Sequence, residues 1–363
     1  DSLTPIHSLH ARVDAWREVT GRAIEMFVGD IQDWFFISKV IADFKPDAIV
    51  HYGEIPSAPY SMIDVHHAVR VHENNVNGTL NVLWAMHQFA PDSHLIKLGT
   101  MGEYGTPNID IPEGYFEVEY RGRKDVLPFP KQAGSFYHLT KVHDSNNIMF
   151  ACKIWGLRAT DLNQGVVYGI ETEESNLDDR LLTRFDYDES FGTALNRFCV
   201  QAVAGIPLTL YGKGHQTRGY LNILDTLQCV ELTALNPPQP GRMRVFNQWV
   251  EHFSVRDLAL HVRTAARQVG LDVKIAHYMN PRGEAEEHYY NPDHNELYSL
   301  GLKPHLLDDT LVEQVIERIL QYQDRIIQHS IIPRIYWQRG STEDYVEIVE
   351  YEEQQVNASV VRG

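Results

Sequence analysis

Tyr137 and Lys141 are separated by three residues in the run FYHLTKVHDSNNI (136–148). On a helix, residues four apart lie on one face about one turn apart, so the ammonium group can lie beside the phenol. An adjacent ammonium stabilises the phenolate and lowers the pKa of the tyrosine from its usual value of about 10. The spacing therefore predicts that Tyr137 is a general base for a sugar hydroxyl. An arbitrary match to this spacing is most often an exposed helical pair. The surrounding segments therefore decide whether Tyr137 and Lys141 are catalytic.

Two further polar residues follow predicted strands. Thr100 comes after the apolar run 94–98, and Asn163 comes after the run 157–162. In an open parallel sheet, the residues that follow the carboxyl ends of the strands meet in one crevice. We therefore expect Thr100 and Asn163 to lie beside the Tyr137 helix, where the threonine hydroxyl can share the proton of a reacting substrate hydroxyl.

Strand and helix signals alternate through the first 170 residues. Short apolar runs that end in turn residues predict strands at 24–28, 47–50, 94–98 and 157–162, and helical spacing of apolar residues predicts helices at 34–44, 76–89 and 136–155. This order predicts an α/β fold with a doubly wound, Rossmann-like parallel sheet and a smaller substrate-binding domain. One more strand is expected at 208–211 and an acidic loop at 171–190.

The composition excludes several classes of protein. The 363 residues fit one large domain or two fused ones, and 49 acidic against 32 basic residues give a net charge of −17. Such an acidic chain is a poor partner for nucleic acid, and no apolar run is long enough to predict a membrane span. Three scattered cysteines indicate a reducing compartment. The histidines at 66, 67 and 72 lack the cysteine or carboxylate partners of a metal site, so we expect no metal.

Several short segments resemble the extended short-chain dehydrogenase/reductase family, in its nucleotide-sugar branch. TMGEYG (100–105) is similar to the Ser/Thr-x-x-x-Tyr-Gly segment, NVNGT (75–79) to the Asn-x-x-Gly-Thr helix beside the cofactor, and RGYLNI (218–223) to the Arg-x-Tyr segment that grips a diphosphate. Longer runs, such as GTMGEYGTPNIDIPEGY (99–115) and EAEEHYYNP (284–292), resemble the UDP-sulfoquinovose synthases of this branch. The resemblance extends from about residue 2 to about residue 338.

This resemblance implies a reaction. Members of the group oxidise UDP-glucose at C4 with NAD, remove water across C5 and C6, add sulfite at C6 and reduce C4 again, which gives the UDP-sulfoquinovose used for sulfolipid head groups. It implies that Tyr137 is the C4 base, that Lys141 holds the nicotinamide ribose and that Thr100 hydrogen-bonds the reacting hydroxyl. His138 and Glu103 are the nearest titratable groups for proton transfer at C5 and C6.

The resemblance also implies two sets of binding residues. Those for NAD are Asp30, Ile31, Tyr52, Gly53, Glu54, Asn75, Tyr137, Lys141, Gln164 and Val167. Those for the nucleotide sugar are Met101, Gly102, Asn163, Thr209, Tyr211, Gln216, Arg218 and Arg282. The two arginines suit a diphosphate because a guanidinium group is a planar, permanently charged fork. Met101 and Gly102 stand where sugar 4,6-dehydratases carry Asp-Glu, and we expect the small glycine to leave space near C6 for an incoming anion.

Two departures from the family pattern are visible. No Gly-x-x-Gly-x-x-Gly occurs before Asp30, so the run 24–28 corresponds to the third strand of the family and about forty residues with the first two strands are expected to be absent. Their loss would open a gap of roughly 10–15 Å beside the 47–50 strand. We therefore expect the 363-residue chain to bind NAD poorly. Ile55 and Pro56 replace a Gln-Arg pair of the family, which removes a cation that could attract sulfite.

The predicted organisation has two domains and an acidic tail. Residues 1–167 and 220–249 form the NAD-binding domain, 168–219 and 250–330 the nucleotide-sugar domain, and 339–363 a mobile tail. The expected partners are UDP-glucose, sulfite, a sulfite-donating enzyme and a second copy of the chain, through helix 76–89 or 138–155. The expected compartment is the cytoplasm, or alternatively the plastid stroma. Two alternative functions stay open: a UDP-sugar 4-epimerase or 4,6-dehydratase, and a truncated, non-catalytic UDP-sugar-binding remnant.

Overall fold

The computed structural model describes residues 2–282, 288–337, 340–341 and 348–352. Its first domain is built on a parallel sheet with the strand order β1–β2–β5–β9. These strands span Ala48–His51, His94–Thr100, Arg158–Gln164 and Met243–Gln248. The order agrees with the predicted doubly wound α/β fold, in which crossover helices connect parallel neighbours.

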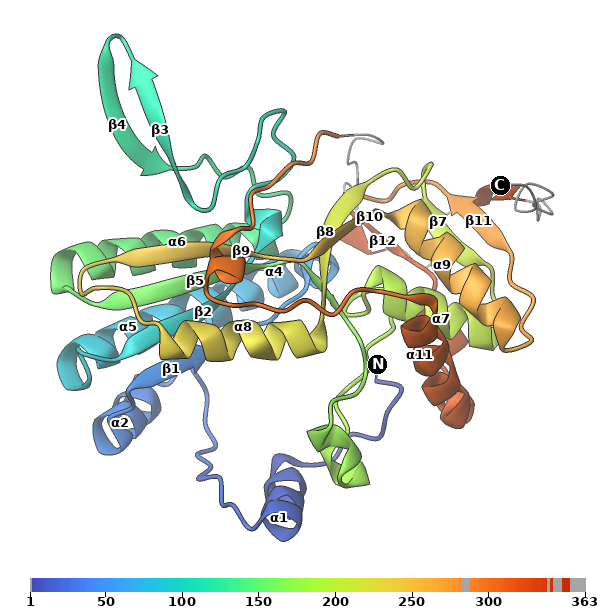
Figure 1. Ribbon diagram of the computed structural model, residues 1–363, viewed down its shortest axis with the longest axis horizontal. Helices are drawn as coiled ribbons and strands as arrows, with labels where there is room; N and C mark the ends of the chain where they lie inside the picture. The colour runs from blue at the N-terminus through green and yellow to red at the C-terminus, as the bar shows by residue number, and fades with distance from the viewer. Residues whose placement is uncertain (1, 283–287, 338–339, 342–347, 353–363) are drawn as a thin grey trace.

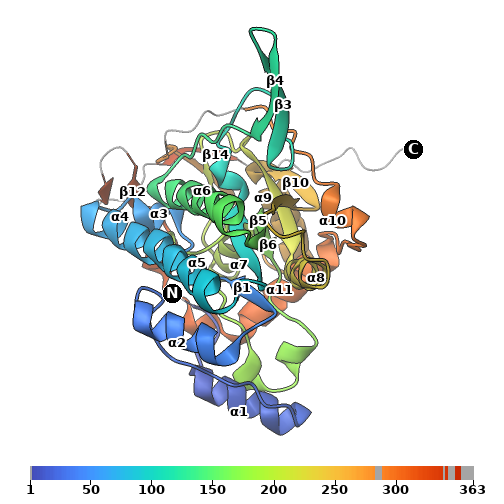
Figure 2. The same ribbon diagram turned by 90° about the vertical axis from the view of Figure 1, so that its left-hand side faces the viewer.

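Helices cover both faces of this sheet (Figures 1 and 2). On one face, α2 (Trp34–Phe44), α5 (Gly78–Phe89) and α6 (Phe136–Trp155) pack with Leu95 and Ala159 into an apolar cluster. On the other face, α8 (Ile223–Leu235) packs against Ile96 and Leu162. Because successive strand residues point to opposite faces, Lys97 and Asp161 point toward α6, as Leu95 and Ala159 do.

Two of these helices have the predicted bounds because their ends are capped. Asp33 accepts hydrogen bonds from the first turn of α2, and Ser135 accepts one from His138 at the start of α6. Gly156 ends α6 in the left-handed conformation, with φ of 72°, which a glycine adopts without a steric penalty. The cap at Ser135 fixes the turn of helix that carries Tyr137 and His138.

The predicted strand at 24–28 is wrong. Residues 22–30 form neither strand nor helix, and Ile24 and Val28 are 53% and 69% exposed. A strand needs a hydrogen-bonded neighbour, and in the described part of the chain no strand pairs with the outer edge of β1. The apolar residues of this run are therefore not evidence for a sheet position.

The second domain surrounds the largest apolar cluster. Helices α7 (Ala194–Ala204), α9 (Val255–Gln268) and α11 (Asp309–Gln321) pack there with strands of two small sheets, β6–β8–β10 and β7–β11–β14. These strands span Val166–Tyr168, Thr217–Asn222, Glu251–Ser254, Leu208–Tyr211, Ile275–Tyr278 and Ile348–Glu352.

Two observations change the predicted domain boundaries. Leu3 is buried in the second domain's cluster, and the Thr4 hydroxyl donates a 2.7 Å hydrogen bond to the Thr183 carbonyl, so the first residues do not belong to the NAD-binding domain. Strand β14 lies inside the segment predicted to be a mobile tail and pairs with β11. The other tail residues, apart from 340–341, lie outside the described residues.

The remaining elements are shorter or peripheral. The hairpin β3–β4 stands out from the body above β9 (Figure 1). None of the described helices is long and apolar enough to cross a membrane. The elements not yet given are α1 (Leu9–Thr20), α3 (Ala58–Ser61), α4 (Val65–His72), η1 (Glu73–Asn77), η2 (Met101–Glu103), β3 (Tyr115–Tyr120), β4 (Arg123–Pro128), η3 (Glu174–Asn176), η4 (Asp179–Leu181), α10 (Glu296–Ser299), η5 (Gln323–Arg325), η6 (Gln328–Ser330), β12 (Ile335–Tyr336) and β13 (Gly340–Ser341).

Candidate active site

Two adjoining cavities lie where the strands of the first domain meet the second domain. One, of about 310 Å³, is lined by Thr100, Gly102 and His138 together with residues of the second domain. The other, of about 190 Å³, is lined by Thr209, Tyr211 and Gln216. Both are bounded by Val166, Arg218 and Arg282. The two arginines therefore join the cavities into one elongated cleft at the carboxyl ends of the parallel strands, where open α/β sheets bind ligands.

Tyr137 and Lys141 share one face of α6, and both side chains are buried. The Lys141 ammonium lies 5.7 Å from the centre of the Tyr137 ring, donates a 2.7 Å hydrogen bond to the Leu98 carbonyl and forms an ion pair with Glu54. Burial and the Glu54 carboxylate raise the pKa of Tyr137 above its ordinary value of 10. The predicted lowering of this pKa is therefore wrong for the ligand-free protein, because Glu54 neutralises the ammonium that would stabilise a phenolate.

His138 lies against the backbone of Gly102. A Cβ atom at position 102 would lie 2.3 Å from Nε2 of His138, so the absence of a side chain there is what lets the imidazole occupy its place. Nδ1 of His138 lies 3.1 Å from the Ser135 hydroxyl, which also caps α6. The expectation that Gly102 leaves space for an anion is thus wrong, since the space beside it is filled by the imidazole.

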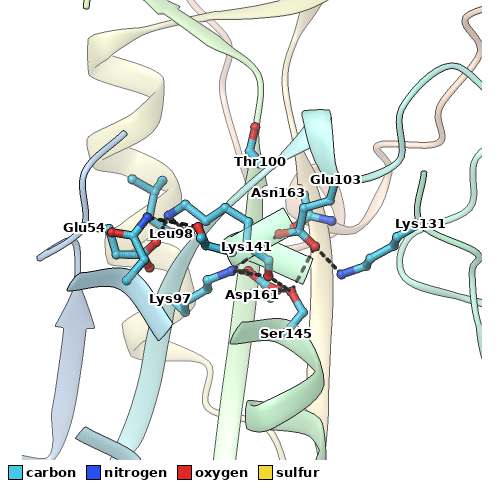
Figure 3. Close-up of polar contacts among 12 residues, drawn as sticks. Glu54, Lys97, Leu98, Thr100, Glu103, Lys131, Lys141, Ser145, Asp161 and Asn163 are labelled. Carbon is cyan, nitrogen blue, oxygen red and sulfur yellow. Dashed lines mark hydrogen bonds and ion pairs between the residues drawn. The ribbon is translucent and has the colours of Figure 1, made fainter. Parts of the chain in front are cut away.

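A network of buried charges lies behind the cleft, between α6 and the sheet (Figure 3). Lys97 of β2 is fully buried, 3.5 Å from Glu103 and 3.6 Å from Asp161. Glu103 also pairs with Lys131 and accepts a 3.0 Å hydrogen bond from Ser145. Burial alone would raise the pKa of Glu103, but Lys97 and Lys131 lower it to about 2. Glu103 is therefore an ionised structural group, and it does not line either cavity.

The Ser145 hydroxyl lies among three acceptor oxygens of this network. Its oxygen lies 2.5 Å from Asp161 Oδ2, 3.0 Å from Glu103 Oε2 and 3.1 Å from the Lys141 carbonyl. A hydroxyl group has one hydrogen, so it cannot donate to both carboxylates. Burial raises the pKa of Asp161 more than Lys97 lowers it. Asp161 and Glu103 thus share one hydroxyl, and burial holds the pKa of Asp161 above its ordinary value.

Comparison with known proteins agrees with this geometry. The sequence pattern of the NAD dependent epimerase/dehydratase family matches residues 3–247. A UDP-sulfoquinovose synthase of spinach, Spinacia oleracea, described as chloroplastic, is 58% identical over 93% of this chain and 70% of its own length. A UDP-sulfoquinovose synthase of Sulfolobus acidocaldarius is 45% identical over 93% of this chain and 87% of its own length.

The chain belongs to the UDP-sulfoquinovose synthases of the NAD dependent epimerase/dehydratase family. Solved structures support the fold of this family more distantly. A UDP-glucuronic acid 4-epimerase of Bacillus cereus, in complex with UDP-glucuronic acid and NAD, superimposes with a TM-score of 0.65 at 20% identity, over 88% of this chain and 90% of that one. A UDP-glucose 4-epimerase of Bifidobacterium longum, with NAD⁺ and UDP, gives 0.64 at 17% identity, over 88% of each chain.

NAD is the cofactor of this family, and the residues for its nicotinamide half fit that group. The Glu54 side chain is 1% exposed and its carboxylate accepts no hydrogen bond from the described residues, while the Lys141 ammonium lies against it. An acceptor beside a donor is what the two hydroxyls of a ribose require. Asn75 hydrogen-bonds the backbone of Ile55 on one side and Thr140 of α6 on the other, and so holds the Glu54 loop against the helix.

The other expected NAD residues do not share one face of the sheet, since Ile31 packs with the cluster of α2, α5 and α6 and Val167 with that of α8. Ile31 fills the space beside Gly53 and Gly78, at 3.1 Å and 2.8 Å from where their Cβ atoms would lie. Asp30 is exposed and caps the following turn, and Tyr52 is exposed as well. No pyrophosphate cradle accompanies them in the described residues. Gly99, Gly102 and Gly105 have the Gly-x-x-Gly-x-x-Gly spacing but open only the three-residue turn η2, and a Cβ at position 105 would meet the Gln132 carbonyl at 2.1 Å.

The structure brings most of the predicted sugar-nucleotide residues to the cleft. Those that line it are Met101, Gly102, Thr209, Tyr211, Gln216, Arg218 and Arg282, with Thr100, His138 and Gln164. Asn163 and Val167 do not line it. Asn163 is fully buried and donates a 2.8 Å hydrogen bond to the Tyr104 hydroxyl, and Val167 packs beside α8. Asn163 therefore supports the floor of the cleft rather than facing a ligand.

Two charged residues of the site were missed by sequence reasoning. Lys97 is the only charged residue of β2, and Arg197 is the only charged residue of α7. Each stands at a position of an otherwise apolar element that faces the interior, and both are buried. Both residues could have been found from the sequence as single charges on the inward face of a strand or helix, because such a residue must find a partner or a ligand.

Proposed function

We propose that the protein converts UDP-glucose and sulfite into UDP-sulfoquinovose. The observation that carries this proposal is the elongated cleft that joins Thr100 and His138 to Arg218 and Arg282. A hexose at the first end and a diphosphate at the second match the chemistry of these groups. The names of relatives at 58% and 45% identity support the same substrate and product.

Thr100 and His138 line the cleft, whereas Tyr137 is buried and lines neither cavity, so its proposed role rests on the Tyr-x-x-x-Lys motif of the family. NAD, when bound, accepts a hydride from C4 of the hexose and later returns it. Tyr137 takes the proton of the C4 hydroxyl, and Thr100 hydrogen-bonds that hydroxyl. Removal of the C5 proton and of the C6 hydroxyl then releases water. We assign these transfers to His138, because it lines the cleft and Glu103 does not. Sulfite adds at C6 as hydrogensulfite, whose proton goes to C5, and the proton held by Tyr137 returns to the C4 oxygen as the hydride returns to C4.

The sulfite site in this chain differs from the family pattern. Ile55 and Pro56 supply no cation, and Pro56 is exposed. Arg218, Arg282 and His288 are the basic residues that line the cavity beside Thr100, together with His138. We therefore propose that the sulfite anion is held by this group of basic side chains, whether it arrives free or from a donor enzyme.

The test is product formation by the 363-residue chain with saturating NAD, UDP-glucose and sulfite. Mass spectrometry should detect a sulfonated nucleotide sugar, and Tyr137→Phe should abolish it. UDP-galactose or a 6-deoxy-4-keto sugar would instead support an epimerase or a dehydratase. Binding of UDP-glucose without any product, with bound NAD verified by absorbance, would support a non-catalytic binding protein.

Assembly and compartment belong to the same proposal. Helices α5 and α6 carry exposed apolar side chains, including Trp84, Phe150 and Ile154, which supports a homodimer through these helices. Light scattering of the purified chain should give twice the monomer mass, and Phe150→Glu should reduce it. We propose the cytoplasm as the compartment, with the plastid stroma as the alternative that the name of the spinach relative supports. Cell fractionation distinguishes the two.

A further inference from the structure

Arg197 is buried and has no partner for its charge in the part of the chain that the structure describes. It stands in the first turn of α7, and only 4% of its surface is exposed. No carboxylate pairs with it and no hydrogen bond is donated by its guanidinium to any described residue; its Nε is fully enclosed and unpaired. Its guanidinium lies over two aromatic rings, that of Tyr211 at 5.4 Å and that of Phe198 at 5.9 Å. An ionised group in this position costs several kcal/mol unless something else compensates it.

The cavity beside Arg197 has no carboxylate among the described residues that line it. Its lining includes Arg197, Arg218 and Arg282 and contains neither Asp nor Glu. The Tyr211 ring lies between two of the arginines, with the Arg282 guanidinium 5.6 Å from its centre and that of Arg197 at 5.4 Å. Three guanidinium groups around one cavity, in a chain with a net charge of −17, create a local positive potential that favours a bound anion.

The end of α7 adds to this potential. Gly192, Thr193 and Ala194, which begin the helix, line the same cavity, and the Thr193 side chain caps the helix by accepting from Asn196. The first turn of a helix carries a partial positive charge and unpaired N–H groups. Arg197 and the start of α7 thus form one wall of the cleft. Arg218 comes from a different element, strand β8.

We propose that Arg197 is a third diphosphate-binding residue, which grips the nucleotide opposite Arg218 and makes the site specific for a nucleoside diphosphate. This inference deepens the proposed function, since it names a residue of the nucleotide site. A bidentate guanidinium–phosphate contact is charge-assisted and roughly twice as strong as a neutral hydrogen bond. In the ligand-free protein the same guanidinium destabilises the fold, because it is buried with no counter-charge.

The test combines binding with stability, using Arg197→Met, which keeps the length and removes the charge. Calorimetric titration should show that the Kd for UDP rises about 10- to 100-fold, as the loss of a charged hydrogen bond predicts, whereas the Kd for uridine changes less than about threefold. The melting temperature of the ligand-free variant should equal or exceed that of the wild type. A residue with a purely structural role would give the reverse, a lower melting temperature with UDP binding preserved.

Two further variants keep the proposal falsifiable. Arg197→Lys retains the charge and should bind UDP more tightly than Arg197→Met, while Arg267→Met, an exposed arginine on α9, should leave the Kd for UDP unchanged. A Kd for UDP within twofold of the wild type in Arg197→Met, or an equal loss of UDP and uridine binding, overturns the proposal. Failure of the sulfonation assay with this binding pattern intact would refute the proposed reaction and not the role of Arg197.

Discussion

Substitution of Gly102 by alanine tests the geometry at the centre of the cleft. The new Cβ would lie 2.3 Å from Nε2 and 2.5 Å from Cδ2 of His138. Carbon and nitrogen atoms that are not bonded approach favourably at about 3.5 Å, so the imidazole must move by about 1 Å. It cannot turn freely, because Nδ1 lies 3.1 Å from the Ser135 hydroxyl that caps α6. A displacement of this size costs on the order of 100-fold in rate, or about 2.7 kcal/mol of transition-state stabilisation.

The assay measures kcat/KM for the sulfonation of UDP-glucose in Gly102→Ala and in a matched control. Gly134→Ala is the control, because Gly134 lines the same cavity and a Cβ there meets no atom within 4 Å. We expect about a 100-fold loss in the first variant and less than threefold in the second, with unchanged circular dichroism. In addition, Gly102→Ala combined with His138→Ala should be no slower than His138→Ala alone. Activity of Gly102→Ala within threefold of the wild type would refute the assignment of His138.

Three other substitutions test the buried charges. Burial and the Glu54 carboxylate raise the pKa of Tyr137, and Glu54→Gln removes the second cause, so the rising limb of the pH–kcat/KM profile should move to lower pH; an unmoved profile would contradict this cause. Lys97→Met should lower the free energy of unfolding by about 3–5 kcal/mol in urea titrations, because it removes the buried cation between Glu103 and Asp161; a loss below 1 kcal/mol would show that the network relaxes. Because the pKa of Glu103 is about 2 in the folded protein against an ordinary 4.5, its contribution to stability is present above pH 4.5 and lost as the pH falls toward 2. Glu103→Gln should therefore flatten the acid limb of the stability curve, and an unchanged slope between pH 5 and 2 would refute the ionised state.

The sequence predicted the elements whose ends carry local signals. The helices at 34–44 and 136–155 have the expected bounds because Asp33 and Ser135 cap them, and the central strands were visible as short apolar runs. The run 24–28 has the same apolar character but no hydrogen-bonded neighbour, and a strand cannot be judged from its own residues alone. Local pattern therefore identified helices better than it identified sheet membership.

The sequence predicted which residues line the cleft better than it predicted their pKa values. Thr100, His138 and the two arginines of the cleft follow from motif positions. The pKa of Tyr137 does not, because it depends on Glu54, which lies 83 residues away along the chain and reaches Lys141 only in the folded protein. Interactions between side chains from distant segments are not encoded in spacing, so the sign of this shift required the structure.

The β3–β4 hairpin has a practical consequence for observing this protein. Its two-residue turn, Arg121–Gly122, adopts left-handed angles at both positions, φ of 52° and 75°, and every residue of β4 is exposed. Such exposed tips tolerate inserted sequence with little effect on the rest of a fold. A fluorescent label or affinity peptide inserted between these two residues would show where the enzyme is in living cells and leave the cleft between the two domains unchanged.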